Sequence, residues 1–148
     1  MNTFKLRPYN VDDEDAAIAL WHRTWKEAYP SIDFDARLQA WRERWQNELA
    51  PSASIVVAER GNRIIGFVTV DKTGYLDQLV VEPQSWGSRL GDSLLDCAKT
   101  LSPGGITLLV NADNSRAIRF YQRNGFTRTH DAVNALSGRK VHGMAWKP

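Results

Sequence analysis

Cysteine is nearly absent from this sequence, and Cys97 is the only one among 148 residues. A lone thiol cannot form an internal disulfide, so the chain is not a small scaffold held together by disulfides. Cys97 also lies within a predicted helix and has no histidine near it in sequence, which argues against a nucleophilic role. The stability of the fold must therefore come from an ordinary hydrophobic core.

Excess charge of one sign and long apolar runs are lacking as well. The formal net charge is only +2, so bulk charge does not indicate nucleic-acid binding, although a sequence pI of 8.8 is compatible with a local basic site. No apolar run is long enough to cross a bilayer, and no signal-peptide pattern is recognisable. We therefore expect a soluble, cytoplasmic protein without a metal site, for which nucleic acid is an improbable partner.

What the sequence does contain fits one α+β domain over residues 1–148, because 43% of the residues are hydrophobic. Apolar residues at helical spacing predict four helices, at about 16–29, 35–50, 88–101 and 117–124. The second helix is expected to end at Pro51. Strand-like patterns predict seven strands, at about 4–7, 55–59, 63–70, 75–81, 106–110, 126–130 and 140–146. The pattern indicates a mixed sheet flanked by helices.

The stretch 75–95 reads as a strand, a tight turn and a helix. The strand stops at Pro83, the chain turns through Gly87, and a helical pattern begins at about Leu90. A helix entered through such a turn presents unpaired backbone N–H groups and the positive end of its dipole. The turn is therefore a natural seat for a phosphate or pyrophosphate, although a purely structural strand–turn–helix gives the same pattern.

Three features, in this order and spacing, resemble the GNAT superfamily of acetyl-CoA-dependent N-acetyltransferases. The first is the strand that ends at Pro83, followed by the turn and Leu90-Gly91. The second is Asn114, at the start of the later helix. The third is Tyr121 within residues 117–126, a run that is similar to the family's Ala, Phe-Tyr, Gly-Phe signature. The resemblance covers nearly the whole chain and implies a mostly antiparallel central sheet; a homodimer is plausible on the same ground.

The turn departs from the family pattern, which is Arg/Gln-x-x-Gly-x-Gly/Ala. In the register set by the strand and the helix, Trp86, Arg89 and Gly91 occupy the three specified positions, and only Gly91 conforms. The resemblance implies that acetyl-CoA contacts the turn residues Trp86, Gly87, Ser88, Arg89, Leu90 and Gly91. Arg89 either points inward, so that replacing it with glycine weakens acetyl-CoA binding roughly tenfold, or points outward and contributes little. If Arg89 instead blocks the site, the domain has lost acyl-CoA binding.

Acetyl transfer to an amine makes defined chemical demands. A lysine-like amine is only about one part in a thousand neutral at pH 7, so a base or proton relay is useful, and the departing thiolate benefits from a proton donor. The resemblance implies that Tyr121 is that donor, that the backbone of Leu79, Val80 and Val81 holds the pantetheine and thioester, and that Asn114 binds the pantetheine arm. Tyr121 can also be a plain core aromatic, and Asn114 a plain helix N-cap.

The base is not specified by a motif. Asp77 shares a strand face with Leu79 and Val81 by the two-residue period. A carboxylate in an apolar strand is expected to have either a hydrogen-bonding partner or a functional role. We expect Asp77 to be either a base that acts through water or a structural, hydrogen-bonded carboxylate. Other candidates for the base are Glu27, Glu82 and His142.

Four tryptophans form two i, i+4 pairs on the first two predicted helices, at positions 21, 25, 41 and 45. Helix packing is the first expectation for them. An exposed Trp25, together with Tyr29, would form a wall for the acceptor chain.

The interpretation is an N-acetyltransferase that moves an acetyl group from acetyl-CoA directly to a primary amine. The acceptor stays open among small amines, amino acids, antibiotics, a protein N-terminus and a lysine side chain. The alternative is a non-catalytic acyl-CoA-binding or regulatory domain of the same fold.

Overall fold

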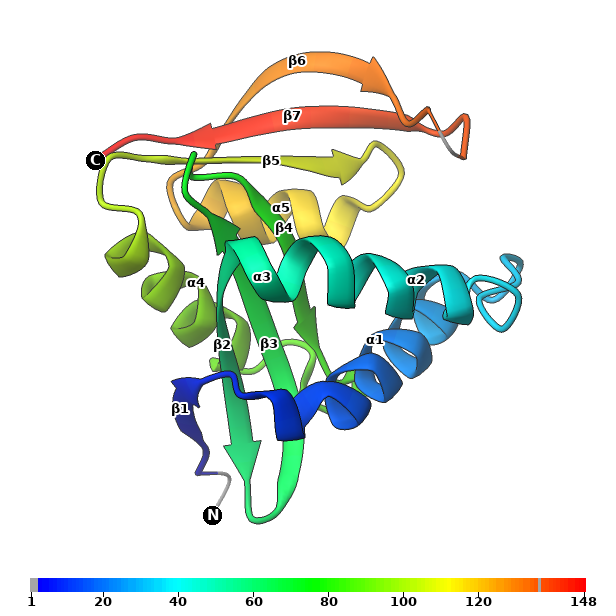
Figure 1. The fold of residues 1–148 in the computed structure, drawn as a ribbon. Helices are drawn as coiled ribbons and strands as arrows, with labels where there is room; N and C mark the ends of the chain where they lie inside the picture. The colour runs from blue at the N-terminus through cyan, green and yellow to red at the C-terminus, as the bar shows by residue number, and fades with distance from the viewer. Residues whose placement is uncertain (1–2, 136) are drawn as a thin grey trace.

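A computed structural model describes residues 3–135 and 137–148, and its strands form two sheets (Figure 1). The first has the order β1-β2-β3-β4, made of β1 (Lys5–Pro8), β2 (Ala53–Arg60), β3 (Arg63–Asp71) and β4 (Leu76–Val81). The second has the order β5-β7-β6, made of β5 (Ile106–Asn111), β6 (Thr127–Val133) and β7 (Lys140–Trp146). Neighbouring strands within each sheet are antiparallel. The predicted mixed fold is therefore confirmed. The predicted domain also includes residues 1–2 and 136, which lie outside the described residues.

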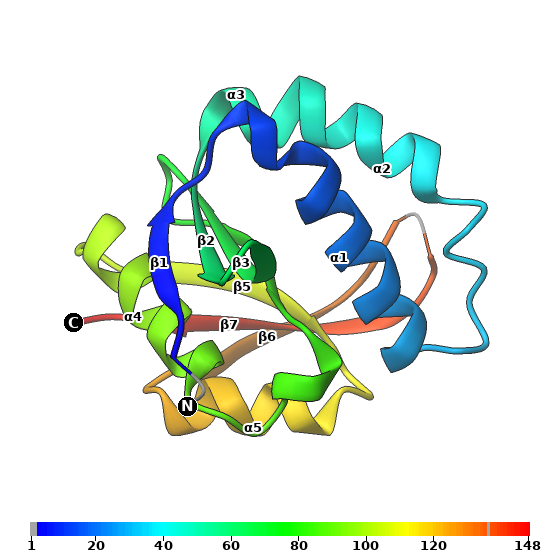
Figure 2. The same cartoon turned by 90° about the horizontal axis from the view of Figure 1, so that it is seen from below.

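The helices cover the first sheet on both sides, as Figure 2 shows. On one side lie α1 (Glu14–Ala28) and α2 (Leu38–Arg44), and on the other side lie α4 (Leu90–Leu101) and α5 (Ser115–Arg123). The second helix ends at Ser52, within one residue of the predicted end at Pro51. It continues from α2 through a π-helical turn (Trp45–Leu49) into α3 (Ala50–Ser52). Pro51 lies in the last turn of this continuous helix, which ends one residue later at Ser52.

Two hydrophobic cores lie on the two faces of the first sheet. The tryptophan core packs α1 and α2 against the sheet and includes Trp21, Trp41 and Trp45, which are at most 7% exposed. The α4 core packs the apolar face of α4 against the sheet and includes Leu90, Leu94, Leu95 and Ala98. The expectation of helix packing is thus confirmed for three of the four tryptophans. Trp25 is only partly buried.

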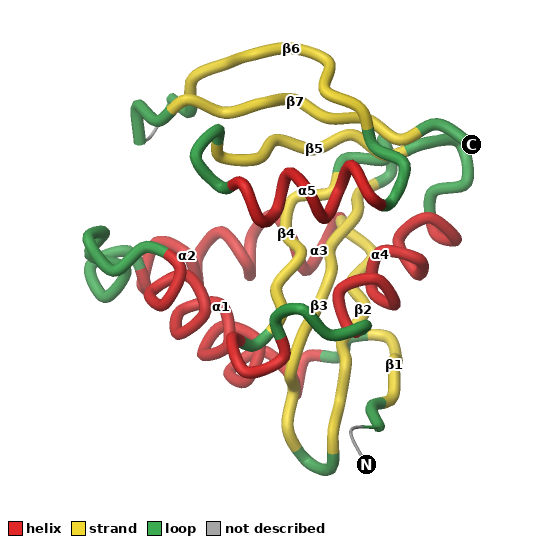
Figure 3. The backbone as a smooth tube through the Cα atoms, turned by 180° about the vertical axis from the view of Figure 1, so that it is seen from behind, coloured by secondary structure: helices red, strands yellow, loops and turns green. Residues whose placement is uncertain are grey.

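Among the described residues, the strands of the two sheets pair at one isolated bridge, just before the start of β4. Tyr75 pairs with Thr107 in an isolated parallel bridge, and the backbone N–H of Thr107 donates to the carbonyl of Gly74 at 2.9 Å. Beyond that bridge the two strands belong to different sheets. Seen from behind in Figure 3, α5 lies in front of this junction. Within the described residues, the edge of β4 away from β3 pairs with no other strand beyond this bridge.

A β-bulge changes which side chains of β4 share a face. Thr69 pairs with Gln78 and Val70 pairs with Leu76, so Asp77 is an extra residue in β4. Leu79 and Val81 pack on the α4 core, whereas Asp77 contacts Arg44 of α2. The prediction that Asp77 shares a face with Leu79 and Val81 is therefore wrong, because the extra residue shifts the alternation.

No helix in the described part of the chain is long and apolar enough to cross a membrane.

Candidate active site

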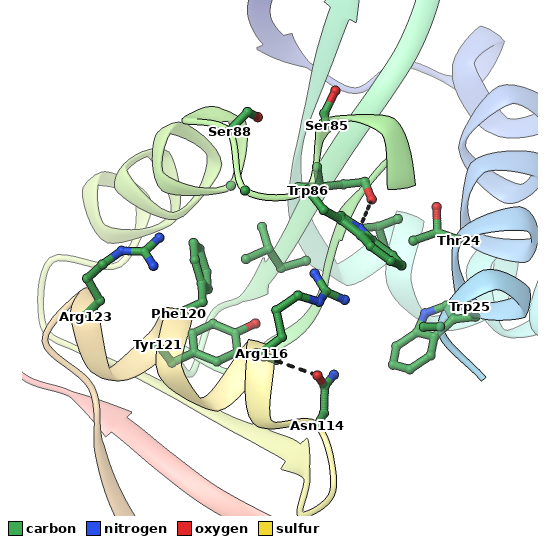
Figure 4. A pocket seen from close by; sticks show the side chains of 17 residues that line it. Thr24, Trp25, Ser85, Trp86, Ser88, Asn114, Arg116, Phe120, Tyr121 and Arg123 are labelled. Atoms are coloured by element: carbon green, nitrogen blue, oxygen red, sulfur yellow. Dashed lines mark hydrogen bonds between the residues drawn. The ribbon is translucent and has the colours of Figure 1, made fainter.

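A cavity of about 200 Å³ lies where the end of β4, the turn into α4, α1 and α5 come together (Figure 4). Ten residues were predicted to contact the cofactor, and eight of them line this cavity: Leu79, Val80, Val81, Trp86, Gly87, Ser88, Gly91 and Asn114. The exceptions are Arg89, which is exposed, and Leu90, whose side chain is 1% exposed in the α4 core. One cavity thus brings together residues from sequence positions more than thirty apart.

The turn has the geometry that its sequence predicts. Gly87 has a φ of 84°, a value that residues with a side chain rarely adopt. Helix α4 begins at Leu90, directly after the turn, and its N-cap residue Arg89 makes no side-chain capping bond. The first backbone N–H groups of α4 therefore remain available to an anion. The backbone N–H of Leu90, the first of these groups, donates only a long hydrogen bond of 3.3 Å to the Ser88 hydroxyl oxygen.

Gly91 allows α4 and α5 to approach closely beside the cavity. A Cβ atom at this position would lie 3.1 Å from Cε1 of Phe120. Few real contacts of a Cβ atom are that short, so a larger residue would push the Phe120 ring. The small residue that the pattern requires at position 91 thus has a packing reason as well as any role in binding.

Tyr121 reaches the cavity from α5. Its ring packs against Phe120 and Phe126, with centroid distances of 5.2 and 5.3 Å. The residue is 8% exposed, and its hydroxyl, which points into the cavity in Figure 4, makes no hydrogen bond to any described residue. Burial raises the pKa of the Tyr121 phenol above its ordinary value. At neutral pH this hydroxyl therefore carries a proton that it can donate.

Asn114 is the N-cap of α5, and its Oδ1 accepts a hydrogen bond from the backbone N–H of Ala117 at 3.2 Å. The N-cap expectation is confirmed. Because the residue also lines the cavity, its amide nitrogen can serve a ligand while its oxygen caps the helix.

The carboxylates and the histidine considered as bases lie outside the cavity lining. Both carboxylate oxygens of Asp77 accept hydrogen bonds from Arg44. Glu82 is 2% exposed and is bound by Arg60, Arg63 and the Ser85 hydroxyl. Nδ1 of His142 lies 2.8 Å from Asp131, and Glu27 is exposed.

Two residues were suggested for the acceptor wall, and they differ in position. Trp25 lines the cavity, whereas Tyr29 does not. Tyr29 stacks on the Trp25 ring at 5.7 Å. The Tyr29 hydroxyl donates to Oδ1 of Asp113 and accepts from Nδ2 of Asn111, each at 3.1 Å. Tyr29 thus ties the Trp25 side of the cavity to the end of β5.

Several lining residues were not singled out from the sequence, and the charged ones matter most. Arg116 and Arg123 line the cavity, and no acid does so among the described residues. Both arginines lie on the α5 face that also carries Phe120, a spacing of about one helical turn that the sequence displays. Within residues 3–135 and 137–148, no group of three or more His, Cys, Asp or Glu side chains could hold a metal ion.

Comparison with known proteins identifies the family. A family model described as an acetyltransferase (GNAT) domain matches residues 24–148. The peptidyl-lysine N-acetyltransferase YjaB of Salmonella typhimurium is 29% identical over 126 residues, which cover 84% of this chain and 83% of that protein. The mycothiol acetyltransferase of Saccharopolyspora erythraea is 30% identical over 127 residues, 78% of this chain but only 41% of that protein.

Solved structures share the fold. The PaiA N-acetyltransferase of Thermoplasma acidophilum, in complex with coenzyme A, has a TM-score of 0.78 at 19% identity and a match over 99% of both chains. The apo form of YjaB from Escherichia coli has a TM-score of 0.77 at 22% identity and a match over 97% of both chains. The family model covers most of the present sequence, so this chain belongs to the GNAT acetyltransferase family.

Proposed function

We propose that this protein transfers the acetyl group of acetyl-CoA directly to a primary amine, with Tyr121 as the general acid toward the departing thiolate. The observation that carries the proposal is the Tyr121 hydroxyl, which is protonated, free of any described partner and directed into the cavity beside β4. A thiolate formed there would meet a proton donor already in place.

The cavity suits the other parts of acetyl-CoA. The turn through Gly87 and the start of α4 offer backbone N–H groups to the pyrophosphate. The edge of β4 away from β3 is paired with β5 only at Tyr75 within the described chain. Backbone groups near Leu79 and the N–H of Val81 are thereby left for the pantetheine arm, whereas the Val81 carbonyl accepts from Nε1–H of Trp86. A backbone N–H of this edge can also stabilise the oxyanion that forms when the amine attacks the thioester.

For proton removal from the amine, two roles were open for Asp77. Its ion pair with Arg44 and its place outside the cavity lining favour the structural role. The amine would then react as the free base or lose its proton through water. For the acceptor, we propose a lysine side chain in a peptide as the first class to test, because a relative matched over 84% of this chain and 83% of its own length is a peptidyl-lysine N-acetyltransferase.

The test combines binding with turnover. Acetyl-CoA binding is measured by calorimetry, and coenzyme A release is measured with a lysine peptide blocked at its N-terminus, a peptide with a free N-terminus, free amino acids and a polyamine. Release that depends on one acceptor, with acetylated product seen by mass spectrometry, supports the proposal. Binding without transfer to any amine would favour the non-catalytic alternative, and absence of binding would contradict both.

A further inference from the structure

Arg116 and Trp86 form a contact across the cavity. The guanidinium carbon of Arg116, on α5, lies 3.9 Å from the ring centroid of Trp86, in the turn before α4. Trp86 is held in place because its Nε1–H donates to the backbone carbonyl of Val81 at 2.8 Å. Figure 4 shows the Arg116 side chain extending from α5 toward the turn, in the space between Tyr121 and Trp86. The contact thus fixes a guanidinium beside the turn that is suited to a pyrophosphate.

The charge of Arg116 is not balanced by the protein. No carboxylate among the described residues pairs with it, whereas the other lining arginine, Arg123, pairs with Asp92 at 3.2 Å. Burial lowers the pKa of the Arg116 guanidinium, yet an arginine remains protonated at neutral pH. Arg116 is exposed as a residue, but its guanidinium lines the cavity and stacks on Trp86, so without a carboxylate partner it is placed to pair with an anionic ligand.

The turn itself does not supply such a charge. Trp86 stands at the turn position for which the sequence pattern specifies Arg or Gln. Arg89, the turn's own arginine, is exposed and does not line the cavity. The guanidinium that lies against Trp86 belongs instead to Arg116 of α5.

We propose that Arg116, positioned by stacking on Trp86, binds the pyrophosphate of acetyl-CoA and supplies the positive charge that the turn lacks. The proposal rests on the proposed function, because it assumes that acetyl-CoA occupies this cavity. Arg116 is a binding residue in this scheme, and Trp86 is a positioning residue.

The experiment compares three ligands by calorimetric titration of the full chain. Acetyl-CoA carries the pyrophosphate and the 3′-phosphate, its dephospho form carries the pyrophosphate alone, and acetyl-pantetheine carries neither. The variants are Arg116→Gln, Arg116→Lys and, as a matched control, Arg119→Gln, which removes the same charge from a position of the same helix that does not line the cavity. Thermal unfolding of each variant verifies that the fold is retained.

We expect Arg116→Gln to weaken the binding of acetyl-CoA and of its dephospho form by about 10- to 100-fold, the usual effect of losing a charge-assisted hydrogen bond. Acetyl-pantetheine binding should not change, Arg116→Lys should give an intermediate loss, and Arg119→Gln should stay within about twofold of the parent protein. Trp86→Leu should reproduce part of the loss for the two pyrophosphate ligands.

Other patterns overturn the inference. A loss seen with acetyl-CoA alone would assign Arg116 to the 3′-phosphate, and an equal loss with all three ligands would make its role structural. Unchanged affinities in Arg116→Gln would remove it from the site, while the proposed function would stand. If the parent protein binds none of the three ligands, the proposed function fails, and this inference fails with it.

Discussion

Asp77 in the β4 bulge and Arg44 of α2 form a two-pronged ion pair, in which the two guanidinium N–H groups donate to the two carboxylate oxygens. The pair is half-buried, with side-chain exposures of 15% for Asp77 and 38% for Arg44. It joins the helix of the tryptophan core to the strand that borders the cavity. This geometry favours a structural role for Asp77.

Asp77→Asn should therefore lower the free energy of unfolding and leave the chemistry intact. We expect a loss of about 0.5–2 kcal/mol, between the values for exposed and buried pairs, measured by chemical denaturation. Arg44→Gln should cost a similar amount, and the double variant should cost less than the sum of the two. If Asp77 is instead the base, the acidic limb of the pH–rate profile will flatten in the Asn variant while its stability hardly changes.

Trp25 gives a prediction about the acceptor side of the cavity. Trp25→Ala should raise the KM for the amine by roughly tenfold or more, because a large aromatic wall is removed, and should leave acetyl-CoA affinity nearly unchanged. Tyr29→Phe keeps the ring stacked on Trp25 and loses only the bonds to Asn111 and Asp113, so its effect should be smaller. Steady-state kinetics with each substrate varied in turn will separate the two sides. Equal losses for amine and acetyl-CoA would contradict the assignment.

Arg89→Gly is expected to have a smaller effect on acetyl-CoA affinity than the roughly tenfold loss expected if the Arg89 guanidinium pointed into the site. Its side chain is exposed and lies outside the cavity lining, and exposed ion pairs contribute about 0–1 kcal/mol. Arg89→Gly should thus change acetyl-CoA affinity by less than about fivefold at moderate salt. Titrations at low and high ionic strength provide the measurement, and a tenfold loss would show that the side chain turns inward when the ligand binds.

Asp13 makes stability depend on pH. Hydrogen bonds from Arg7 at 2.7 and 2.8 Å hold the pKa of Asp13 below its usual value. Because the folded-state pKa is the lower one, the contribution is complete above the unfolded pKa of about 3.9 and is lost as the pH falls through the folded value. The difference in unfolding free energy between the parent and Asp13→Asn should be constant from about pH 6 to 8 and shrink below about pH 4.

Denaturant titrations across this pH range provide the measurement for Asp13, and Asp12→Asn is the control. Asp12 lies beside Asp13 but is exposed. A difference of the same size for both variants would mean that the general loss of negative charge, and not the Arg7 pair, sets the pH dependence.

The sequence predicted those features that depend on local periodicity and short-range pattern. The order of helices and strands followed from apolar spacing, the start of α4 followed from Pro83 and Gly87, and the cap at Asn114 followed from residue type. Eight of the ten predicted cofactor residues line one cavity because they belong to two segments, each of which is locally continuous.

Features that depend on tertiary structure could not be predicted in this way. The bulge that turns Asp77 toward Arg44 is set by the pairing of β4 with β3, and alternation along one strand cannot reveal it. The contact of Arg116 with Trp86 joins residues thirty positions apart, so neither residue indicates it alone. The exposure of Arg89 likewise depends on how α4 packs, with Leu90 directed into the core.

The most direct test of the central claim is a comparison of Tyr121→Phe with the parent protein, once an acceptor is found. The change removes one hydroxyl and keeps the ring that packs on Phe120 and Phe126, so folding and acetyl-CoA affinity should be nearly unchanged. Loss of a general acid should lower the rate of acetyl transfer in a single turnover by about 10²- to 10⁴-fold. An unchanged single-turnover rate, with acetyl-CoA still bound, would contradict the assignment of Tyr121 as the proton donor.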